Sequence, residues 1–115
     1  MTGLALGMIL GMNPVPKIHA VGVCDTPDYF YDIMVSIAEE MGFCNIPEGY
    51  KSLKDLFQSH VRVYQGKGKG YAVSTKEELE YVSQFSRQTG IILDPVYTGK
   101  ALYHFVTNVM QENEE

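Results

Sequence analysis

The most constraining feature of this chain is the sequence GIILDPVYTGKALY at positions 90–103, where a short apolar run meets an amphipathic pattern. Ile91–Leu93 is too short for a helix and has the length of a buried strand. Asp94-Pro95 ends this strand, because proline has no N–H for a sheet and restricts the residue before it. The sequence therefore predicts a strand that ends in a sharp turn.

A helix is predicted directly after this turn, with Thr98 as its N-cap. Its apolar face is formed by Ala101, Leu102, Phe105, Val106 and Val109. Tyr97 then lies at a strand-turn-helix corner, where α/β proteins place ligand-contacting groups. From its position alone, Tyr97 is either such a group or a corner tyrosine that packs and hydrogen-bonds a neighbour.

The preceding chain alternates between helical and strand patterns. Thr2–Gly11 predicts a helix of small residues, and Lys17–Cys24 predicts a strand that is covered on both faces. The next predicted helix has Thr26 as N-cap, Pro27 at its first position and Gly42 as C-cap. The predicted buried stripe of this helix is Phe30, Ile33, Met34, Ile37, Ala38 and Met41.

The same alternation of helical and strand patterns continues up to the segment at positions 90–103. A short helix is predicted at Leu53–Phe57 and a strand at 61–64. Thr75 and Glu78 form a capping box for a further helix, which Gly90 closes. Its predicted buried stripe is Leu79, Val82 and Phe85, with Tyr81 alongside. The order of elements predicts an α/β fold with a mainly parallel sheet.

Composition narrows the classes of function. A length of 115 residues suits at most one ordinary domain, and 45% apolar residues are typical of a globular chain. The net charge of −5 disfavours nucleic acid as a partner. The two cysteines and three histidines show no metal-binding spacing, and free thiols without a secretion signal fit a reducing compartment. The apolar residues 1–12 are too short to cross a membrane and predict a buried helix.

Two further segments could contact a ligand. The loop GKGKGY at 66–71 alternates glycine and lysine but fits neither of the usual phosphate-binding motifs. It is either a phosphate cradle or a mobile surface loop. Cys24-Asp25 lies at a predicted strand end, where it could touch a ligand or simply lead into the helix cap at Thr26.

The segments TGIILDPVYTGKALY, AVGVCDTPDYFYD and GKGKGYAVSTKEELEYV resemble the D-cysteine desulfhydrase and 1-aminocyclopropane-1-carboxylate deaminase family, and they stand in the family's order. The resemblance covers nearly all 115 residues. It implies a pyridoxal 5'-phosphate (PLP) enzyme of fold type II, the tryptophan synthase β-like fold. Residues 1–115 would be a partial three-layer sandwich with a mainly parallel sheet. This partial domain would lack the family's Schiff-base lysine segment, glycine-rich phosphate loop and extreme C-terminus.

The resemblance also implies roles for individual residues. Tyr97 matches the family's active-site tyrosine, and Tyr71 matches a tyrosine that faces the substrate side of the cofactor. Thr98 stands next to the cofactor ring, where the deaminase branch carries a glutamate that holds a proton on the pyridine nitrogen. A hydroxyl cannot serve as that counter-ion, so Thr98 favours elimination of a good leaving group such as sulfide. Lys100 does not match the family's Schiff-base lysine.

The expected activity is therefore that of a D-cysteine desulfhydrase, which converts D-cysteine to pyruvate, ammonia and sulfide. One alternative is a 1-aminocyclopropane-1-carboxylate deaminase. Another is a non-catalytic truncated form that docks on a full-length subunit, because a partial sheet leaves edges unpaired and apolar faces uncovered. The expected partners are a small amino-acid substrate and, for the full-length protein, a second identical subunit, with no metal, nucleic acid or membrane. The expected location is the cytoplasm, or the mitochondrion where an upstream segment carries a transit peptide.

Overall fold

The computed structural model describes residues 1–111 of the chain, which divide into two compact units. The first unit comprises Met1–Ala20 and Thr26–Tyr64. The second comprises Val21–Asp25 and the chain from Gln65 on. Each unit gathers segments that are distant in the sequence, so each has its own internal packing.

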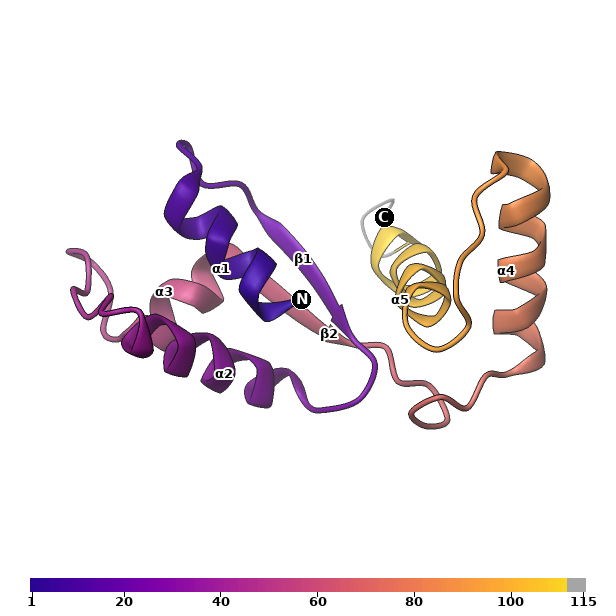
Figure 1. Cartoon of the computed structure of the whole chain (residues 1–115), viewed down its shortest axis with the longest axis horizontal. Helices are drawn as coiled ribbons and strands as arrows, with labels where there is room; N and C mark the ends of the chain where they lie inside the picture. The colour runs from indigo at the N-terminus through magenta and orange to yellow at the C-terminus, as the bar shows by residue number, and fades with distance from the viewer. Residues whose placement is uncertain (112–115) are drawn as a thin grey trace. The chain divides into compact units, whose positions relative to one another are not determined.

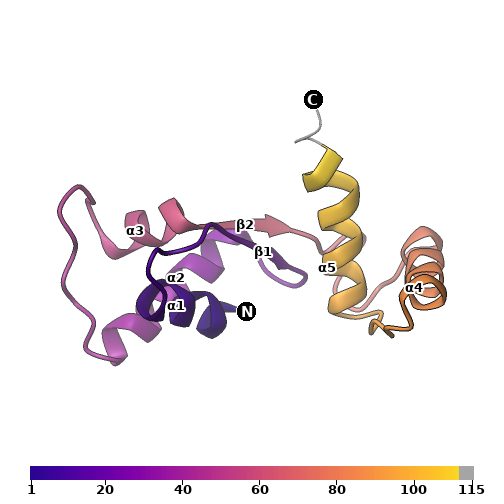
Figure 2. The ribbon, with the colours of Figure 1, turned by 90° about the horizontal axis from the view of Figure 1, so that it is seen from above.

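The first unit contains three helices and most of a small sheet (Figure 1). Its elements are α1 (Thr2–Gly11), β1 (Ile18–Gly22), α2 (Pro27–Glu40), α3 (Leu53–His60) and β2 (Val61–Gln65). The two strands are hydrogen-bonded neighbours, and Figure 2 shows that they run in the same direction. Helices α2 and α3 form the connection between them. This arrangement confirms the predicted α/β class with a parallel sheet.

The core of the first unit is formed where the helices meet the strands. It combines the buried residues of α1, α2, α3 and the strands: Ala5, Leu6, Ile9, Ala20, Tyr31, Met34, Ala38, Leu53, Leu56, Phe57, Val61 and Val63. The Tyr31 hydroxyl donates a hydrogen bond to the Val61 carbonyl at 2.7 Å and accepts one from the Val63 N–H at 3.0 Å. A buried tyrosine therefore satisfies backbone groups of β2, as a buried hydroxyl requires.

The helix ends of the first unit follow local sequence signals. The Thr26 hydroxyl accepts a hydrogen bond from the Tyr29 N–H at 3.4 Å, and Pro27 occupies the first turn of α2. Gly42 follows α2 in a left-handed conformation, with φ +80°. Its N–H donates to the Glu39 carbonyl at 2.9 Å. The predicted N-terminal cap and the C-terminal glycine are thus both confirmed.

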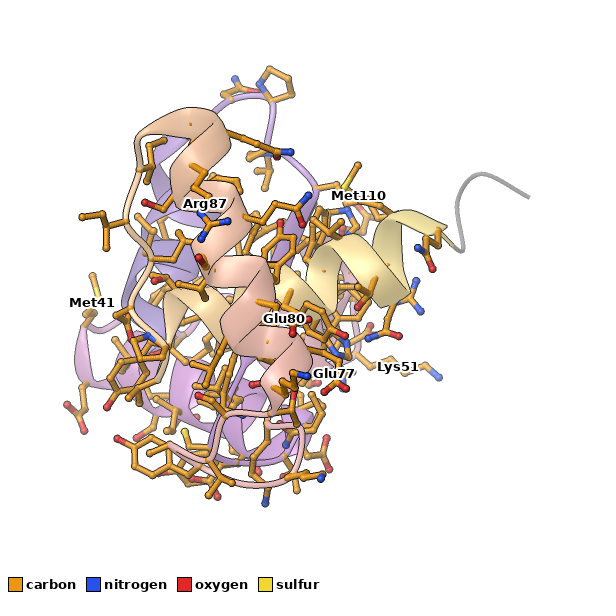
Figure 3. The ribbon with its side chains drawn as sticks, turned by 90° about the vertical axis from the view of Figure 1, so that its right-hand side faces the viewer. Met41, Lys51, Glu77, Glu80, Arg87 and Met110 are labelled. Atoms are coloured by element: carbon orange, nitrogen blue, oxygen red, sulfur yellow. The ribbon has the colours of Figure 1, made fainter. Side chains whose placement is uncertain are left out.

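The second unit is built around α4 (Lys76–Thr89), α5 (Thr98–His104) and the π-helix η1 (Phe105–Met110). The Thr75 hydroxyl accepts a hydrogen bond from the Glu78 N–H at 3.2 Å, and Gly90 ends α4 with φ +75°. The predicted limits of this helix are confirmed. Figure 3 shows Glu77, Glu80 and Arg87 on α4, and all three side chains are exposed.

Two predictions for the second unit are wrong. Ile91–Leu93 forms no strand, and no segment within residues 1–111 pairs with it, because the described sheet consists of β1 and β2 alone. Ile91 and Ile92 are 56% and 84% exposed. The predicted buried stripe of α4 is also absent, since Glu78 is the buried residue of this helix and Leu79 is 48% exposed. A strand needs a hydrogen-bonded neighbour, which the described part of the chain does not supply here. Helix α4 packs against α5 through Tyr81 and Val82, but this contact leaves both side chains only half-buried.

Candidate active site

The two tyrosines singled out from the sequence lie together in the second unit. The hydroxyls of Tyr71 and Tyr97 are hydrogen-bonded to each other. Their ring centroids are 6.0 Å apart, and the ring planes are inclined by 58°. The two side chains are 50% and 52% exposed, respectively. Two half-exposed tyrosines from positions 26 residues apart are thus joined through their hydroxyls.

The carboxylate of Asp94 builds the corner that carries Tyr97. Its Oδ1 accepts hydrogen bonds from the N–H groups of Val96 at 3.0 Å and Tyr97 at 2.7 Å. Its Oδ2 accepts from the Thr98 N–H at 3.0 Å and from the Thr98 hydroxyl at 2.7 Å. An aspartate before proline often folds the following backbone around its side chain in this way. Asp94 therefore holds the backbone on both sides of Tyr97.

These hydrogen bonds change the acidity of Asp94. The bond from the Thr98 hydroxyl, followed by those from the Tyr97 and Thr98 N–H groups, lowers the pKa of the carboxyl from 3.8 to about 2. Each bond favours the charged form, because a carboxylate accepts hydrogen bonds better than a carboxylic acid does. Asp94 is therefore ionised at neutral pH, and it can only accept hydrogen bonds from Thr98.

The prediction that Thr98 caps the helix is wrong. The N-cap position of α5 is Tyr97, which makes no side-chain cap, and the Asp94 carboxylate accepts the N–H groups instead. The Thr98 hydroxyl donates to Asp94 Oδ2 and accepts from the Asp94 N–H at 3.0 Å. A hydroxyl has one proton and two lone pairs. In this arrangement Thr98 can accept one more hydrogen bond but has no proton left to donate.

Gly99 allows α4 and the corner to approach each other closely. A Cβ atom at this position would lie 2.7 Å from the Asp94 carbonyl oxygen and 2.7 Å from Cγ2 of Val82. The Gly99 N–H also donates to the Asp94 carbonyl at 2.8 Å. Any larger residue would push the turn away from α4, so the backbone of the Tyr97 corner depends on glycine here.

The loop that carries Tyr71 is a pair of consecutive turns. The Gly70 N–H donates to the Lys67 carbonyl at 3.3 Å, and the Val73 N–H donates to the Gly70 carbonyl at 3.1 Å. The Ser74 hydroxyl then donates to the Pro95 carbonyl at 3.2 Å. The end of the Tyr71 loop is thereby tied to the turn that precedes Tyr97.

Lys100 lies beside the candidate site, and its contacts were not predicted from the sequence. Its side chain is fully buried, and Nζ lies 2.9 Å from Oε2 of Glu78, whose side chain is 8% exposed. Nζ also donates to the Lys67 carbonyl at 3.0 Å. The Glu78 carboxylate, expected to complete a capping box, is therefore engaged with Lys100. No local pattern reveals this pair, because the two residues are 22 positions apart.

The hydrogen bond between the phenols affects the acidity of Tyr71. The bond with Tyr97 is the main cause that raises the pKa of the Tyr71 phenol above its ordinary value of 10.0. Partial burial and the negative charges of an ionised Tyr97 and Cys24 act in the same direction. The raised pKa favours the protonated form of Tyr71, whose hydroxyl can either donate to the Tyr97 oxygen or accept from it.

Comparison with known proteins gives a match over almost the whole chain. No known protein-family model matches the chain. A curated relative from Arabidopsis thaliana, bifunctional D-cysteine desulfhydrase/1-aminocyclopropane-1-carboxylate deaminase, mitochondrial, is 41% identical over 110 residues. The predicted relationship to the D-cysteine desulfhydrase/1-aminocyclopropane-1-carboxylate deaminase family is confirmed. The match covers 96% of this chain and 25% of the relative, so the chain spans about a quarter of that protein's length.

Two further observations concern possible partners. Within residues 1–111, no group of three or more histidine, cysteine, aspartate or glutamate side chains is arranged to hold a metal ion. None of the helices in that same range combines the length and apolar character needed to cross a membrane.

Proposed function

We propose that this chain is the part of a PLP-dependent lyase that supplies the proton-transferring tyrosines for D-cysteine desulfhydration. The products would be pyruvate, ammonia and sulfide. The observation that carries the proposal is the exposed hydrogen-bonded pair of Tyr71 and Tyr97. When bound, pyridoxal 5'-phosphate would supply an electron sink for the substrate carbanion, and the protein would supply positioning and proton transfer.

The residues present fit one side of such a cofactor. Tyr71 and Tyr97 offer two half-exposed side chains with neighbouring aromatic rings and hydrogen-bonded hydroxyls. The amine of Lys100 is buried against Glu78 and is not available for covalent attachment. The family resemblance implies that the attachment lysine belongs to another segment of the full-length subunit.

Tyr97 is the proposed proton-transferring group, and Tyr71 is its partner. A free phenol has a pKa of about 10 and is a poor base at neutral pH. A neighbouring cationic adduct and a hydrogen-bond donor both stabilise a phenolate. Tyr71 can provide this donor, because its hydroxyl is hydrogen-bonded to that of Tyr97 and its raised pKa favours the protonated form. Tyr97 can thus accept a proton from the substrate and return it.

Thr98 supports sulfide elimination over opening of a cyclopropane ring. An unprotonated pyridine nitrogen only accepts hydrogen bonds, so to meet it the Thr98 hydroxyl would turn its proton from Asp94 to the cofactor. Thr98 carries no charge that would hold a proton on the pyridine nitrogen. The resulting weaker electron sink suits a good leaving group such as sulfide. A 1-aminocyclopropane-1-carboxylate deaminase remains the alternative activity within the same family.

Replacement of Tyr97 by phenylalanine tests the proposal in a subunit of full family length that carries this segment. Loss of a positioned acid–base group typically costs about 10²–10⁴-fold in rate. We expect a loss of this size in sulfide release from D-cysteine for Tyr97→Phe, and a smaller loss for Tyr71→Phe. Tyr81→Phe serves as the matched control, because Tyr81 packs against Phe85 and Tyr103. Turnover of Tyr97→Phe near that of the control would remove Tyr97 from the mechanism. Parallel assays with 1-aminocyclopropane-1-carboxylate separate the two activities.

The second candidate is a non-catalytic form that docks on a full-length subunit. The exposed apolar side chains of Ile91 and Ile92 favour it, because they lie in a segment with strand character and no strand partner within residues 1–111. The purified 115-residue chain would then bind no cofactor and release no sulfide. Stoichiometric cofactor binding with turnover would rule out this candidate.

The remaining assignments follow from the proposed activity. The substrate would be a small amino acid, and the full-length protein would form the homodimer that the family resemblance implies. A cytoplasmic or mitochondrial location is proposed, and the printed name of the Arabidopsis relative describes that protein as mitochondrial.

A further inference from the structure

We propose that Lys100 and Glu78 are positioning residues that hold the Tyr71 loop against the Tyr97 corner. Their effect on the two phenols follows from contacts within the second unit. Their effect on turnover rests on the proposed function.

The ion pair joins three segments of the chain. Lys100 lies in the first turn of α5, and Glu78 lies in the first turn of α4. Nζ of Lys100 contacts Oε2 of Glu78 at 2.9 Å and the Lys67 carbonyl oxygen at 3.0 Å. The ammonium group therefore links both helices to the start of the loop that carries Tyr71.

The linked atoms are close in sequence to the two phenols. Lys100 follows Tyr97 by three residues, and Lys67 precedes Tyr71 by four. The Lys67 carbonyl also accepts the Gly70 N–H, which closes the turn directly before Tyr71. One buried amine thus fixes the backbone from which each tyrosine projects, and the hydroxyls meet as a consequence.

Gly68 provides an independent indication that the loop is fitted to this pair. It has φ +64°, a conformation that favours glycine. A Cβ atom here would lie 2.8 Å from Oε1 of Glu78 and 3.4 Å from Nζ of Lys100. The backbone of the Tyr71 loop therefore packs directly on the ion pair, in space that any other side chain would need.

Energetic considerations favour a positioning role over a purely stabilising one. Burial of two charges carries a desolvation cost that often equals their attraction, and apolar replacement of a whole buried pair is often neutral or stabilising. Loss of one partner alone leaves an unpaired buried charge and is strongly destabilising. Both members must therefore be changed together to separate positioning from folding.

The test uses the full chain and the double substitution Glu78→Gln/Lys100→Met, which removes both charges and retains similar side-chain lengths. The readout is the pH titration of the Tyr71 phenol, followed by NMR of ¹³C-labelled tyrosine and assigned with Tyr71→Phe. We expect the pKa of Tyr71 to fall to the value found in Tyr97→Phe. The exposed pair Lys76 and Glu80, 3.7 Å apart, gives the matched control Lys76→Met/Glu80→Gln. This control should leave the Tyr71 titration unchanged.

A folded double variant with an unchanged Tyr71 titration would overturn the proposal. If the double variant does not fold, the Tyr71 titration in Gly68→Ala tests the proposal instead, with Gly49→Ala as its control. Gly49 shares a positive φ of +95°, but a Cβ there would meet nothing within 4 Å. Gly68→Ala alone should lower the Tyr71 pKa, and equal titrations in the two glycine variants would reject the proposal. These outcomes are independent of turnover, so failure of the proposed lyase activity would be recognised separately.

Discussion

The carboxylate of Asp94 makes the corner around Tyr97 sensitive to acid. Its pKa of about 2 lies below the ordinary value of 3.8. A group with a lowered native pKa contributes stability that is fully present above the ordinary pKa and is lost as the pH falls through the native pKa. The hydrogen bonds to Tyr97 and Thr98 should therefore weaken between about pH 4 and pH 2.

Comparison of the chain with Asp94→Asn measures this contribution. We expect the variant to unfold at lower urea concentration than the unchanged chain at pH 6. The difference between the two should shrink as the pH falls from 4 to 2, because protonation removes the carboxylate from the unchanged chain. Other carboxylates titrate in both proteins and cancel in the comparison. A difference that stays constant from pH 6 to pH 2 would contradict the assigned role of Asp94.

The sequence predicted the roles of single residues where these depend on neighbouring residues or follow from the family resemblance. The two tyrosines were chosen from their motifs, but their mutual hydrogen bond depends on tertiary structure. Asp94 could have been identified as the capping group, because Asp-Pro before a helix is a known turn signal. The Lys100–Glu78 pair could not have been identified from the sequence. The two residues are 22 positions apart, and only the fold brings the Lys100 amine to the Glu78 carboxylate.

The packing of α5 against α4 depends on Gly99. An alanine methyl would lie 2.7 Å from the Asp94 carbonyl oxygen and Val82 Cγ2, so the turn would have to move. Overpacking of this kind costs about 1–3 kcal/mol. We expect Gly99→Ala to lower the free energy of unfolding by this amount and to weaken the Tyr71–Tyr97 hydrogen bond.

Gly7→Ala provides the matched control for that substitution. Gly7 lies on an exposed face of α1, and a Cβ there would meet nothing within 4 Å. Alanine favours a helix interior by about 1 kcal/mol relative to glycine, so this variant should be as stable as the unchanged chain or more stable. Equal stabilities of the two variants in urea titration would show that Gly99 is not closely packed.

Helices were predicted more accurately than strands for a physical reason. Helix limits depend on neighbouring residues, and Thr26, Gly42, Thr75 and Gly90 mark them as expected. A strand needs a hydrogen-bonding partner that can come from anywhere in a fold. Ile91–Leu93 has the composition of a strand, but the described part of the chain leaves it unpaired.

The chain as a whole exposes apolar side chains that a folded protein usually covers. Ile92 is 84% exposed and Ile91 is 56% exposed, in an extended segment whose backbone has no sheet partner within residues 1–111. An unpaired apolar segment with strand character is a template for pairing with another chain. We therefore expect the isolated chain to self-associate, and sedimentation at increasing protein concentration should give masses above that of a monomer.

A lysine at position 92 should reduce this association, because a charge on an exposed strand-like segment opposes edge-to-edge pairing. Leu4→Lys is the matched control, since Leu4 is 74% exposed on α1 and lies outside the extended segment. The natural chain and Leu4→Lys should associate alike, whereas Ile92→Lys should shift toward the monomer. If both lysine variants dissociate equally, general hydrophobicity drives association. A monomeric natural chain at all concentrations would remove this segment as a docking surface and leave the non-catalytic candidate without its main support.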